Sequence, residues 1–510
     1  MKYLTGIVVL ILSFSVESKL IQIIHINDLH SYFTGHDDGR GGYAKVKTLI
    51  DQLKEKSRRD GIPSIVLDGG DFGEGTSFFM VDKGVSSFKS LNYLGVDVAV
   101  IGNHDHMLGV DILNEQIKKA GEGFYKPTQI VSANMVQFKG SNNMVKNQVF
   151  LDVEGTKISV IGLSTPEAHF QYTILPSFIA PPNKVAKEEV TYAKEMGADL
   201  VVALTHLGVK KDMKLAEKVE GLDVIIGGHS HDRLEQIVYQ SNPKGRNIPI
   251  VQAGAHGLAV GSLILNVENG KVNVVKYKLH DVHKGIEEDH DVKQFVAEAI
   301  DKRDELFNGK WDEVVGESKI KLTGYENGNA VIKNSCWGKH MARISRKYTG
   351  SQVGIHLAFF QGVVKKPGKV TYGDLVDNYP HFSNYNEPGW KIASFNAKGS
   401  FLKVFIMAMI NLKDQVGFDI DGVTWKTHTV PRWIPAIGGK KIPYKFKVGG
   451  NEMNKRARYS VAFPNEIGFV LQKMVGSFVQ KIFPGFKSHN VYFWESMEAY
   501  VKQQSPIKCI

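Results

Sequence analysis

The sequence predicts an α/β fold in two domains, in which a helix joins a larger first domain to a smaller α/β second domain. Three observations support this prediction. Short β-branched runs alternate with stretches of helical periodicity through the first half of the chain. From Ile248 the pattern changes to hairpins, with Asn269-Gly270 as a turn between two alternating runs. Residues His290–Leu306 then show an uninterrupted helical pattern, which Asn308-Gly309 would end.

The first half supplies the elements of the larger domain. Apolar, β-branched runs predict strands at Leu20–Ile26, Ser64–Leu67, Val96–Ile101, Lys157–Ile161, Leu200–Leu204 and Val224–Ile226. Helical periodicity between these runs predicts helices that include Tyr43–Lys56 and Val185–Glu195. Strands that alternate with helices in this way are typical of a layered α/β domain.

Length and composition support more than one folded domain. The chain has 510 residues, of which 43% are hydrophobic and 23% charged, so it resembles neither a disordered tail nor a linker. We expect a targeting segment at 1–18, the larger domain at 19–285, the connecting helix at 286–316 and the smaller domain at 317–510.

The first residues have the pattern of a secretory signal peptide. Lys2 precedes the apolar run from Leu4 to Val16, which is too short to span a bilayer; a buried N-terminal strand is the alternative. No later stretch approaches about 18 consecutive apolar residues. The end of the chain, Gln503 to Ile510, lacks the hydrophobic tail of a lipid-anchor signal. We therefore expect a secreted, extracellular protein without a membrane anchor.

The cysteines and the net charge do not by themselves identify the function. Cys336 and Cys509 are the two cysteines, so the fold does not depend on a disulfide framework, and their spacing does not decide whether they pair. The formal net charge of +10 favours acidic partners such as nucleotides, cell-surface glycans or anionic membranes. The basic residues are scattered, so a solvated surface is the alternative, and no basic stripe predicts a nucleic-acid partner.

Polar side chains follow the apolar strands of the first half, usually next to a glycine. These side chains are Asp28, His30, Asp71, Asn103, His104, His206, His229 and His231. Open α/β sheets bind ligands at the carboxyl ends of their strands, so five loops would deliver these groups to one rim. A single histidine after a strand is usually structural, whereas five such motifs in order indicate a metal site. Mixed oxygen and nitrogen ligands suit zinc, manganese or iron(II).

The ordered motifs DxH, GD, GNH, TH and GHxH resemble those of the calcineurin-like metallophosphoesterases. Four further segments resemble the 5'-nucleotidase/apyrase branch of that family: RGGYAKV (Arg40–Val46), THLG (Thr205–Gly208), GGHSHD (Gly227–Asp232) and QAGAHGLAVG (Gln252–Gly261). The resemblance covers most of the chain from Ile21 to about Tyr277. It implies a four-layer sandwich for the first domain and a 5'-nucleotidase-like second domain.

The resemblance also implies two divalent metal ions and their ligands. One ion would be held by Asp28, His30, Asp71 and His231, and Asp71 would bridge to a second ion held by Asn103, His206 and His229. Two ions about 3.5–4 Å apart can polarise a phosphoryl group and activate water near neutral pH. The implied reaction is in-line attack on a terminal phosphate, with His104 as the catalytic group that stabilises the phosphoryl oxygens.

One position of this catalytic pattern is changed. The family motif GNHEFD pairs its histidine with a final aspartate that orients the ring, whereas this chain reads GNHDHM and has Met107 at that position. Met107 cannot accept a strong hydrogen bond or hold an imidazolium. Loss of such a group costs roughly 10²–10⁴ in rate when nothing replaces it. Asp105, two residues earlier, is the candidate replacement.

The second domain resembles the family in outline. The segments Lys369–Asn384 and Arg458–Phe469 resemble those that carry the nucleobase-binding aromatic residues. The resemblance implies that Phe382 and Phe469 sandwich the base beside Asn384, although aromatic residues in apolar runs are usually core. Three polar groups that would grip the ribose and phosphates are missing: one family arginine falls near Val331, a second falls on Gly362, and an aspartate falls on Ile467. Each lost charge-assisted contact is worth about 1.5–3 kcal/mol.

These patterns support two main hypotheses. The first is a secreted, metal-dependent phosphohydrolase of extracellular ATP, ADP and AMP, similar to the salivary apyrases of blood-feeding insects, whose removal of ADP would suppress platelet aggregation. The second is a catalytically impaired relative that binds metal, nucleotide or a host cell-surface receptor. A phosphodiesterase or nuclease on the same metal core is a third alternative, which the outline of the second domain disfavours.

Overall fold

The computed structural model describes residues 19–138, 143–167, 171, 173–268, 270–323, 325–326, 330–331, 335–358, 362–383, 387–433, 439–465 and 484–510. The expected signal peptide therefore lies outside the described residues. Within these ranges, no helix combines the length and the apolar character that crossing a membrane requires.

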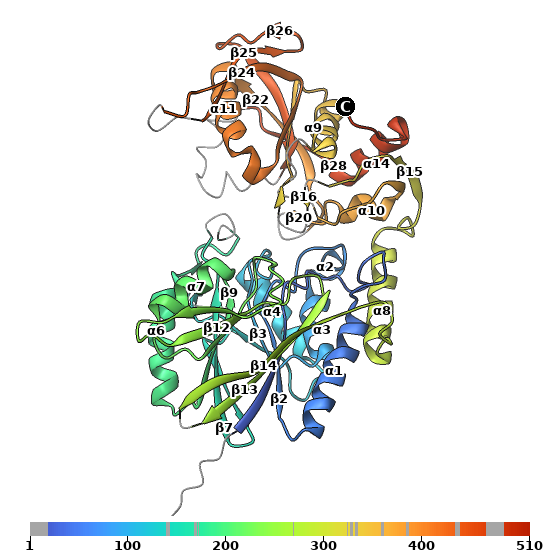
Figure 1. The fold of residues 1–510 in the computed structure, drawn as a ribbon. Helices are drawn as coiled ribbons and strands as arrows, with labels where there is room; N and C mark the ends of the chain where they lie inside the picture. Colours follow the sequence, from blue (N-terminus) through green and yellow to red (C-terminus); the bar gives the residue numbers. More distant parts are fainter. Residues whose placement is uncertain are drawn as a thin grey trace, which may run out of the picture.

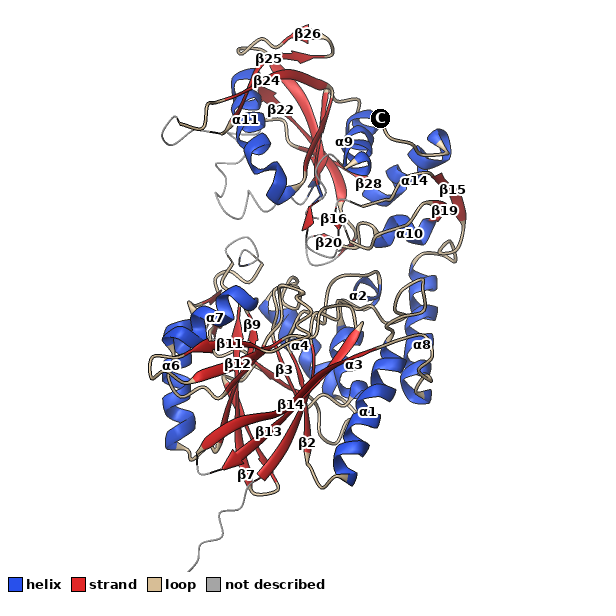
Figure 2. Ribbon diagram, in the orientation of Figure 1, coloured by secondary structure: helices blue, strands red, loops and turns tan. Residues whose placement is uncertain are grey.

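Two six-stranded sheets form the centre of the first domain (Figures 1 and 2). The first sheet has the order β14-β13-β1-β2-β3-β4, and β1 to β4 run parallel. Its strands are β1 (Lys19–Ile26), β2 (Ser64–Asp68), β3 (Val98–Val100), β4 (Gln129–Val131), β13 (Ala259–Glu268) and β14 (Lys271–Asp281). The last two form the expected hairpin, in which Glu268 pairs with Lys271.

The second sheet has the order β11-β12-β10-β9-β7-β6, and its four central strands are parallel. Its strands are β6 (Gln148–Val153), β7 (Thr156–Ser164), β9 (Leu200–His206), β10 (Val224–Ile226), β11 (Val238–Ser241) and β12 (Asn247–Val251). The short strands β5 (Met135–Val136) and β8 (Phe178–Ile179) form a separate pair. Because β9 and β10 are buried along their whole length, their sequences are continuous apolar runs rather than alternating ones.

Helices cover the outer faces of both sheets, which gives four layers. Apolar side chains of both sheets, including Ile23 and Val202, form the core between them. The outer layers are α1 (Tyr43–Arg59), α2 (Phe78–Val81), α3 (Val85–Leu94), α4 (Val110–Gly121) and α8 (His290–Leu306) on one side, and α6 (Pro182–Glu195) and α7 (Val209–Lys218) on the other. The expected four-layer α/β sandwich is therefore present.

The second domain is built on a five-stranded sheet of order β23-β18-β27-β22-β28. Its strands are β18 (Val353–Leu357), β22 (Lys391–Lys398), β23 (Phe418–Asp421), β27 (Arg458–Pro464) and β28 (Lys487–Tyr492). The helices are α9 (Cys336–Thr349), α10 (Tyr372–Asp377), α11 (Gly399–Val416) and α14 (Phe493–Gln504). Smaller sheets join β24 (Val423–Thr429), β25 (Lys441–Val448) and β26 (Asn451–Glu452), and pair β15 (Val314–Ser318) with β19 (Gly368–Thr371), β16 (Tyr325–Glu326) with β17 (Ala330–Val331), and β20 (Phe382–Ser383) with β21 (Glu387–Pro388).

Helix α8 leads from the first domain to the second (Figure 1). Its N-cap is Asp289, whose side chain accepts a hydrogen bond from the Val292 backbone N–H. Phe295 and Ala299 pack into the core of the first domain. Near the end of α8, Arg303 lies over the Trp311 ring, 4.0 Å from its centroid. The helix expected at His290–Leu306 therefore has those bounds and is anchored to the first domain.

Cys336 and Cys509 form a disulfide with a Cα–Cα distance of 5.0 Å. The bond ties the start of α9 to the segment that follows α14, across 173 residues of sequence separation. Sequence spacing left this pairing open, and only the packing of the two segments brings the cysteines within bonding distance.

Candidate metal and phosphoryl-transfer site

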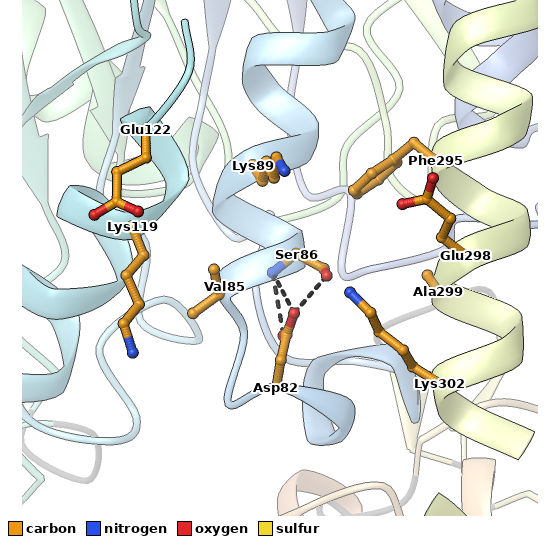
Figure 3. Close-up of a pocket in the computed structure, with 10 residues that line it drawn as sticks. All are labelled: Asp82, Val85, Ser86, Lys89, Lys119, Glu122, Phe295, Glu298, Ala299 and Lys302. Carbon is orange, nitrogen blue, oxygen red and sulfur yellow. Dashed lines mark hydrogen bonds between the residues drawn. The ribbon is translucent and has the colours of Figure 1, made fainter. Parts of the chain in front are cut away.

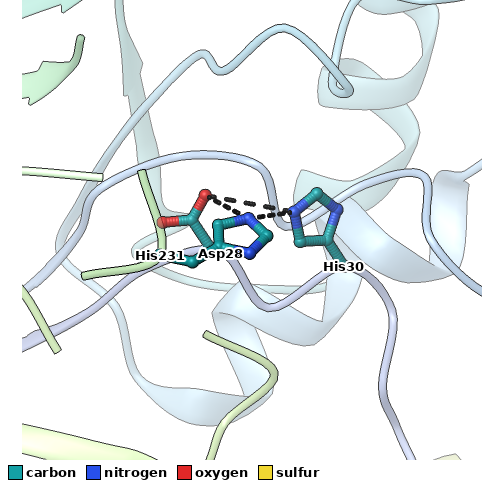
Figure 4. Close-up of side chains that lie close together, drawn as sticks. All are labelled: Asp28, His30 and His231. Atoms are coloured by element: carbon teal, nitrogen blue, oxygen red, sulfur yellow. Dashed lines mark hydrogen bonds and ion pairs between the residues drawn. The ribbon is translucent and has the colours of Figure 1, made fainter. Parts of the chain in front are cut away.

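The eight polar residues that follow the strands lie together at one rim of the first domain. They belong to loops after β1, β2, β3 and β10 and to the last residue of β9, so both sheets contribute. Seven of the side chains form three overlapping groups with potential ligand atoms within 4.8 Å of one another: Asp28, His30 and His231; His30, Asp71 and His104; and Asp71, His206 and His229. The eighth, Asn103, lies beside the third group, with its Oδ1 2.9 Å from His229 Nδ1. The two loops that meet in the first group are shown in Figure 4. Asp71 belongs to both the second and the third group, which is where a carboxylate that bridges two metal ions would lie.

Glycines allow these loops to approach one another. A Cβ atom on Gly102 would lie 2.1 Å from Asp71 Oδ1, and one on Gly228 would lie 2.3 Å from the Gly69 carbonyl oxygen. Either contact is too short for any side chain, so close packing of the loops requires glycine at these two positions.

Five of the grouped residues adopt left-handed backbone conformations. Their φ angles lie between 48° and 80°: Asp28, His30, Asp71, His229 and His231. Non-glycine residues rarely adopt this conformation, and such residues concentrate at functional sites, where surrounding contacts hold them. Here, the His30 backbone N–H donates to the Asp71 carbonyl oxygen at 2.9 Å. The His104 backbone N–H donates to Asp71 Oδ1 at 2.8 Å.

Backbone carbonyls orient two of the imidazoles. His206 Nδ1 lies 2.7 Å from the Gly69 carbonyl oxygen, which directs Nε2 to within 3.0 Å of Asp71 Oδ2. His30 Nδ1 lies 2.7 Å from the Glu74 carbonyl oxygen, and its Nε2 lies 3.1 Å from His231 Nε2. Hydrogen bonds of this kind set the tautomer and ring orientation of metal-ligating histidines.

Burial and the charge of Asp71 shift the pKa values of two of the candidate histidine ligands. Burial lowers the pKa of His30 to about 4, so its ring is neutral and Nε2 carries a lone pair. Burial also lowers the pKa of His206, but the charge of Asp71 outweighs it and raises that pKa to about 10. Buried carboxylate, imidazole and amide groups that face one another fit divalent ions, and these described donors include no thiolate.

Asp105 does not orient His104, so the replacement expected from the sequence is wrong. Its Oδ2 accepts hydrogen bonds from the backbone N–H groups of Asp71 at 2.9 Å and Gly102 at 2.7 Å. Its Oδ1 accepts from the Gly73 N–H at 2.7 Å. Both oxygens are thus committed to the loops after β2 and β3, and Asp105 fixes the distance between them.

Glu74 is the carboxylate that contacts the His104 ring, and the sequence did not single it out. Its Oε2 lies 3.1 Å from His104 Nδ1, and its Oε1 lies 3.1 Å from Nδ1 of His381 in the second domain. Burial raises the pKa of Glu74, but His381 and His104 outweigh it and lower the pKa to about 2. Burial likewise lowers the pKa of His104, whereas Asp71 and Glu74 raise it to about 9.

Two further residues border the site. Glu167 lies 3.4 Å from His229 Nε2 and 2.7 Å from Lys211 Nζ, and hydrogen bonding to His229 lowers its pKa. His256 stacks on Tyr32 with ring centroids 4.0 Å apart. The sequence carried no signal for Glu167, whereas His256 stands in the QAGAHG segment that resembled the family.

Two of the three residues expected at the nucleobase site lie outside the described residues. Asn384 and Phe469 lie outside the described residues, and for Phe382 the described part is its backbone in β20. Gly362, at one of the changed polar positions, is packed closely: a Cβ there would lie 2.5 Å from the Asp377 carbonyl oxygen.

Two cavities lie outside the polar cluster. One, of about 290 Å³, is lined from both domains and includes Tyr32, Arg303, Lys365, Asp374 and Asp377. The other, of about 260 Å³, lies among α3, α4 and α8, where Asp82 accepts hydrogen bonds from Ser86 (Figure 3). The cavity among α3, α4 and α8 is lined by both lysines and carboxylates, and none of the residues grouped at the rim lines it.

Comparison with known proteins agrees with this geometry. Residues 21–233 match the family model described as calcineurin-like phosphoesterase. The first domain is a calcineurin-like phosphoesterase domain. The family expected from the sequence motifs is therefore confirmed for this domain. Calcineurin-like phosphoesterases bind a dinuclear divalent metal site, and the three groups of candidate ligands fit such a site.

Several relatives that match half or more of this chain carry 5'-nucleotidase names. The chain is 28% identical to protein 5NUC of Lutzomyia longipalpis over 60% of its length and 57% of the relative's. It is 29% identical to a snake venom 5'-nucleotidase of Crotalus adamanteus, over 61% of this chain and 56% of that one. The chain thus spans little more than half the length of these relatives. A 5'-nucleotidase precursor of Thermus thermophilus has the same fold, with a TM-score of 0.77, 20% identity and coverage of 96% and 98% of the two chains.

Proposed function

We propose that this chain is a secreted, divalent-metal-dependent nucleotide phosphohydrolase of the apyrase/5'-nucleotidase type, acting on extracellular ATP, ADP and AMP. The observation that carries the proposal is the convergence of six candidate ligands and His104 within overlapping groups at one rim of the phosphoesterase domain, with the seventh candidate, Asn103, 2.9 Å from His229 Nδ1 through its Oδ1. Its relatives named 5'-nucleotidase support the substrate class.

In this proposal, seven residues hold two divalent ions, with zinc and manganese as the expected metals. These residues are Asp28, His30, Asp71, Asn103, His206, His229 and His231. When bound, the ions would lower the pKa of water and polarise a phosphoryl group. Asp71 is the proposed shared ligand because its carboxylate lies 3.0 Å from His206 Nε2 and 3.8 Å from His30 Nε2.

His104 is the proposed catalytic residue. Its Nδ1 lies 3.1 Å from Glu74 Oε2, and in this proposal the ring stabilises the phosphoryl oxygens, on which negative charge grows during transfer. Its backbone N–H is held by Asp71, so the ring keeps a defined position beside the candidate ligands. A side chain held from both ends needs little reorganisation during the reaction.

The second domain is the proposed nucleoside-binding part. Phe382 and Phe469 would stack on the base and Asn384 would bind beside it. Base–aromatic stacking does not depend on the number of phosphates, so this arrangement is compatible with mono-, di- and triphosphates.

Secretion and a role against platelets are the biological part of the proposal. The disulfide between Cys336 and Cys509 supports an oxidising compartment, because cytosolic proteins seldom keep such bonds. Removal of extracellular ADP would then limit platelet aggregation, as in the salivary apyrases that the sequence resembles. ADP-induced aggregation of platelets, measured with and without the protein, tests this role.

Phosphate release by the mature protein tests the activity. ATP, ADP and AMP are offered separately with Mn²⁺ or Zn²⁺, with and without chelator, beside His104→Ala and a His290→Ala control. His290 is a suitable control because its side chain is 89% exposed on α8. We expect chelator-sensitive release that His104→Ala reduces and His290→Ala leaves unchanged. Release equal to the metal-free background in all three proteins would reject the activity.

A binding protein on the same scaffold is the second candidate. Met107 and the apolar or small residues near position 331 and at positions 362 and 467 favour it, because they stand where the family pattern has polar groups. Such a protein would bind metal and nucleotide, or a host cell-surface receptor, without turnover. Calorimetric binding of ADP in the absence of phosphate release would favour this candidate.

A further inference from the structure

Glu74 holds an unusual position between the two domains. It stands three residues after Asp71, in the loop that follows β2, and its side chain is 3% exposed. Each carboxylate oxygen lies 3.1 Å from an imidazole Nδ1, that of His104 in the first domain and that of His381 in the second. A buried carboxylate is costly unless hydrogen-bonded partners compensate it, and the two rings supply that compensation.

The contact with His104 has the geometry of an orienting carboxylate. A carboxylate that accepts from Nδ1–H fixes the tautomer and the ring plane, and stabilises the imidazolium. Met107 offers no such acceptor, and both oxygens of Asp105 already accept backbone N–H groups. Glu74, in the loop after β2, is therefore placed to supply the orienting carboxylate that neither Met107 nor Asp105, in the loop after β3, offers to His104.

The contact with His381 lies within a wider contact between the domains. Three residues beyond Glu74, the Ser77 backbone N–H donates to Asp377 Oδ1 in the second domain at 2.7 Å. Met80, in α2, packs into the apolar core of the second domain. One short segment therefore carries a candidate metal ligand, the carboxylate on His104 and the surface that meets the second domain.

We propose that Glu74 is the positioning residue for His104, in place of a carboxylate at position 107, and that His381 couples this positioning to the second domain. The inference rests on the proposed phosphohydrolase function, in which His104 contacts the phosphoryl oxygens. Glu74 acts on the reaction through His104 and does not touch the substrate.

A double-mutant cycle tests the first part. Glu74→Gln, His104→Ala and the double variant are compared in kcat, KM and bound metal, with Glu115→Gln as a control. Glu115 is a 56% exposed glutamate on α4, paired with Lys119. We expect Glu74→Gln to lower kcat by roughly 10²–10⁴, with KM and metal content within threefold of the wild type. In the His104→Ala background the same change is expected to lower kcat by less than about threefold, because its effect passes through His104.

Two kinetic results would overturn the assignment. One is a kcat for Glu74→Gln within threefold of the wild type. The other is an equal loss of kcat with and without the His104 side chain, which a general structural role of Glu74 would produce. The coupling to the second domain is tested by adding His381→Ala to Glu74→Gln: kcat should fall no further, and an additive loss would remove His381 from the proposal.

The effect of Glu74 on the His104 ring can also be measured without turnover. If the wild-type protein releases no phosphate above the chelator background, the proposed function fails, and ¹⁵N NMR of the imidazoles then tests the inference alone. His104, assigned from His104→Ala, should show a protonated Nδ1 that shifts in Glu74→Gln and not in Glu115→Gln. An unchanged His104 signal in Glu74→Gln would overturn the inference.

Discussion

Replacement of Asp105 by asparagine separates two roles for this buried carboxylate, which are holding the metal-site loops and orienting His104. Aspartate accepts three backbone N–H groups at 2.7–2.9 Å, two on Oδ2 and one on Oδ1. Asparagine has a single acceptor oxygen. If this oxygen takes the place of Oδ2, the Gly73 N–H faces an amide group and loses its partner.

The expected loss of stability in Asp105→Asn follows from the number of backbone N–H groups that lose their acceptor. A buried N–H without an acceptor costs about 1–3 kcal/mol. The two remaining bonds also lose the contribution of the charge. Against this, burial and the charge of Asp71 raise the pKa of Asp105 to about 7, so removal of the charge brings a compensating gain. We therefore expect a net loss of about 1–3 kcal/mol, which corresponds to roughly 2–4 °C per kcal/mol in the melting temperature of a domain of this size.

Differential scanning calorimetry with and without Mn²⁺ measures this change, and Asp111→Asn serves as the control because Asp111 is exposed in the first turn of α4. We expect a lower melting temperature and weaker metal binding for Asp105→Asn, and any loss of kcat should persist in the His104→Ala background. A wild-type melting temperature, with a kcat loss that disappears when His104 is absent, would refute the reasoning and make Asp105 the residue that orients His104.

Three further predictions concern the metal site, the disulfide and the domain interface. Asp71→Asn should lower the bound metal from two ions per chain towards one or none, as measured by inductively coupled plasma mass spectrometry; an unchanged content would reject Asp71 as the shared ligand. Cys336→Ser with Cys509→Ser should destabilise the second domain by up to about 5 kcal/mol, because the bond closes a loop spanning 173 residues, and an unchanged calorimetric transition would contradict this. Burial raises the pKa of Asp377 to about 6, so the unfolded chain loses this proton first as the pH rises. Its contribution to stability is therefore present below about pH 4 and lost through pH 6, by roughly 3 kcal/mol; relative to Asp377→Asn, the wild-type melting temperature should fall over this range, and parallel curves would reject the assignment.

Much of the phosphoesterase domain could be predicted from local patterns. The run Leu200–Leu204 lies within β9 and the run Leu20–Ile26 lies within β1, because strands buried on both faces require continuous apolar sequence. The helix expected at His290–Leu306 has those bounds in α8. The polar residues after the strands converge because parallel strands place their carboxyl ends at one edge of a sheet.

The partner of His104 could not be predicted in this way. Sequence proximity suggested Asp105, but the turn after β3 directs that carboxylate to backbone N–H groups of neighbouring loops. Glu74 reaches His104 from the loop after β2, across 30 residues of sequence. The roles of Phe382, Asn384 and Phe469 in nucleoside binding remain predictions.

By itself, the sequence determined the α/β class, the strand-end positions of the candidate ligands and the family of the first domain. Each depends on periodicity or on short motifs, in which the decisive residues are neighbours along the chain. The tertiary structure decided three other matters: the Cys336–Cys509 bond, the commitment of Asp105 to backbone groups, and the position of Glu74 between His104 and His381. These depend on the direction of side chains from segments far apart in sequence, which packing sets and local pattern does not encode.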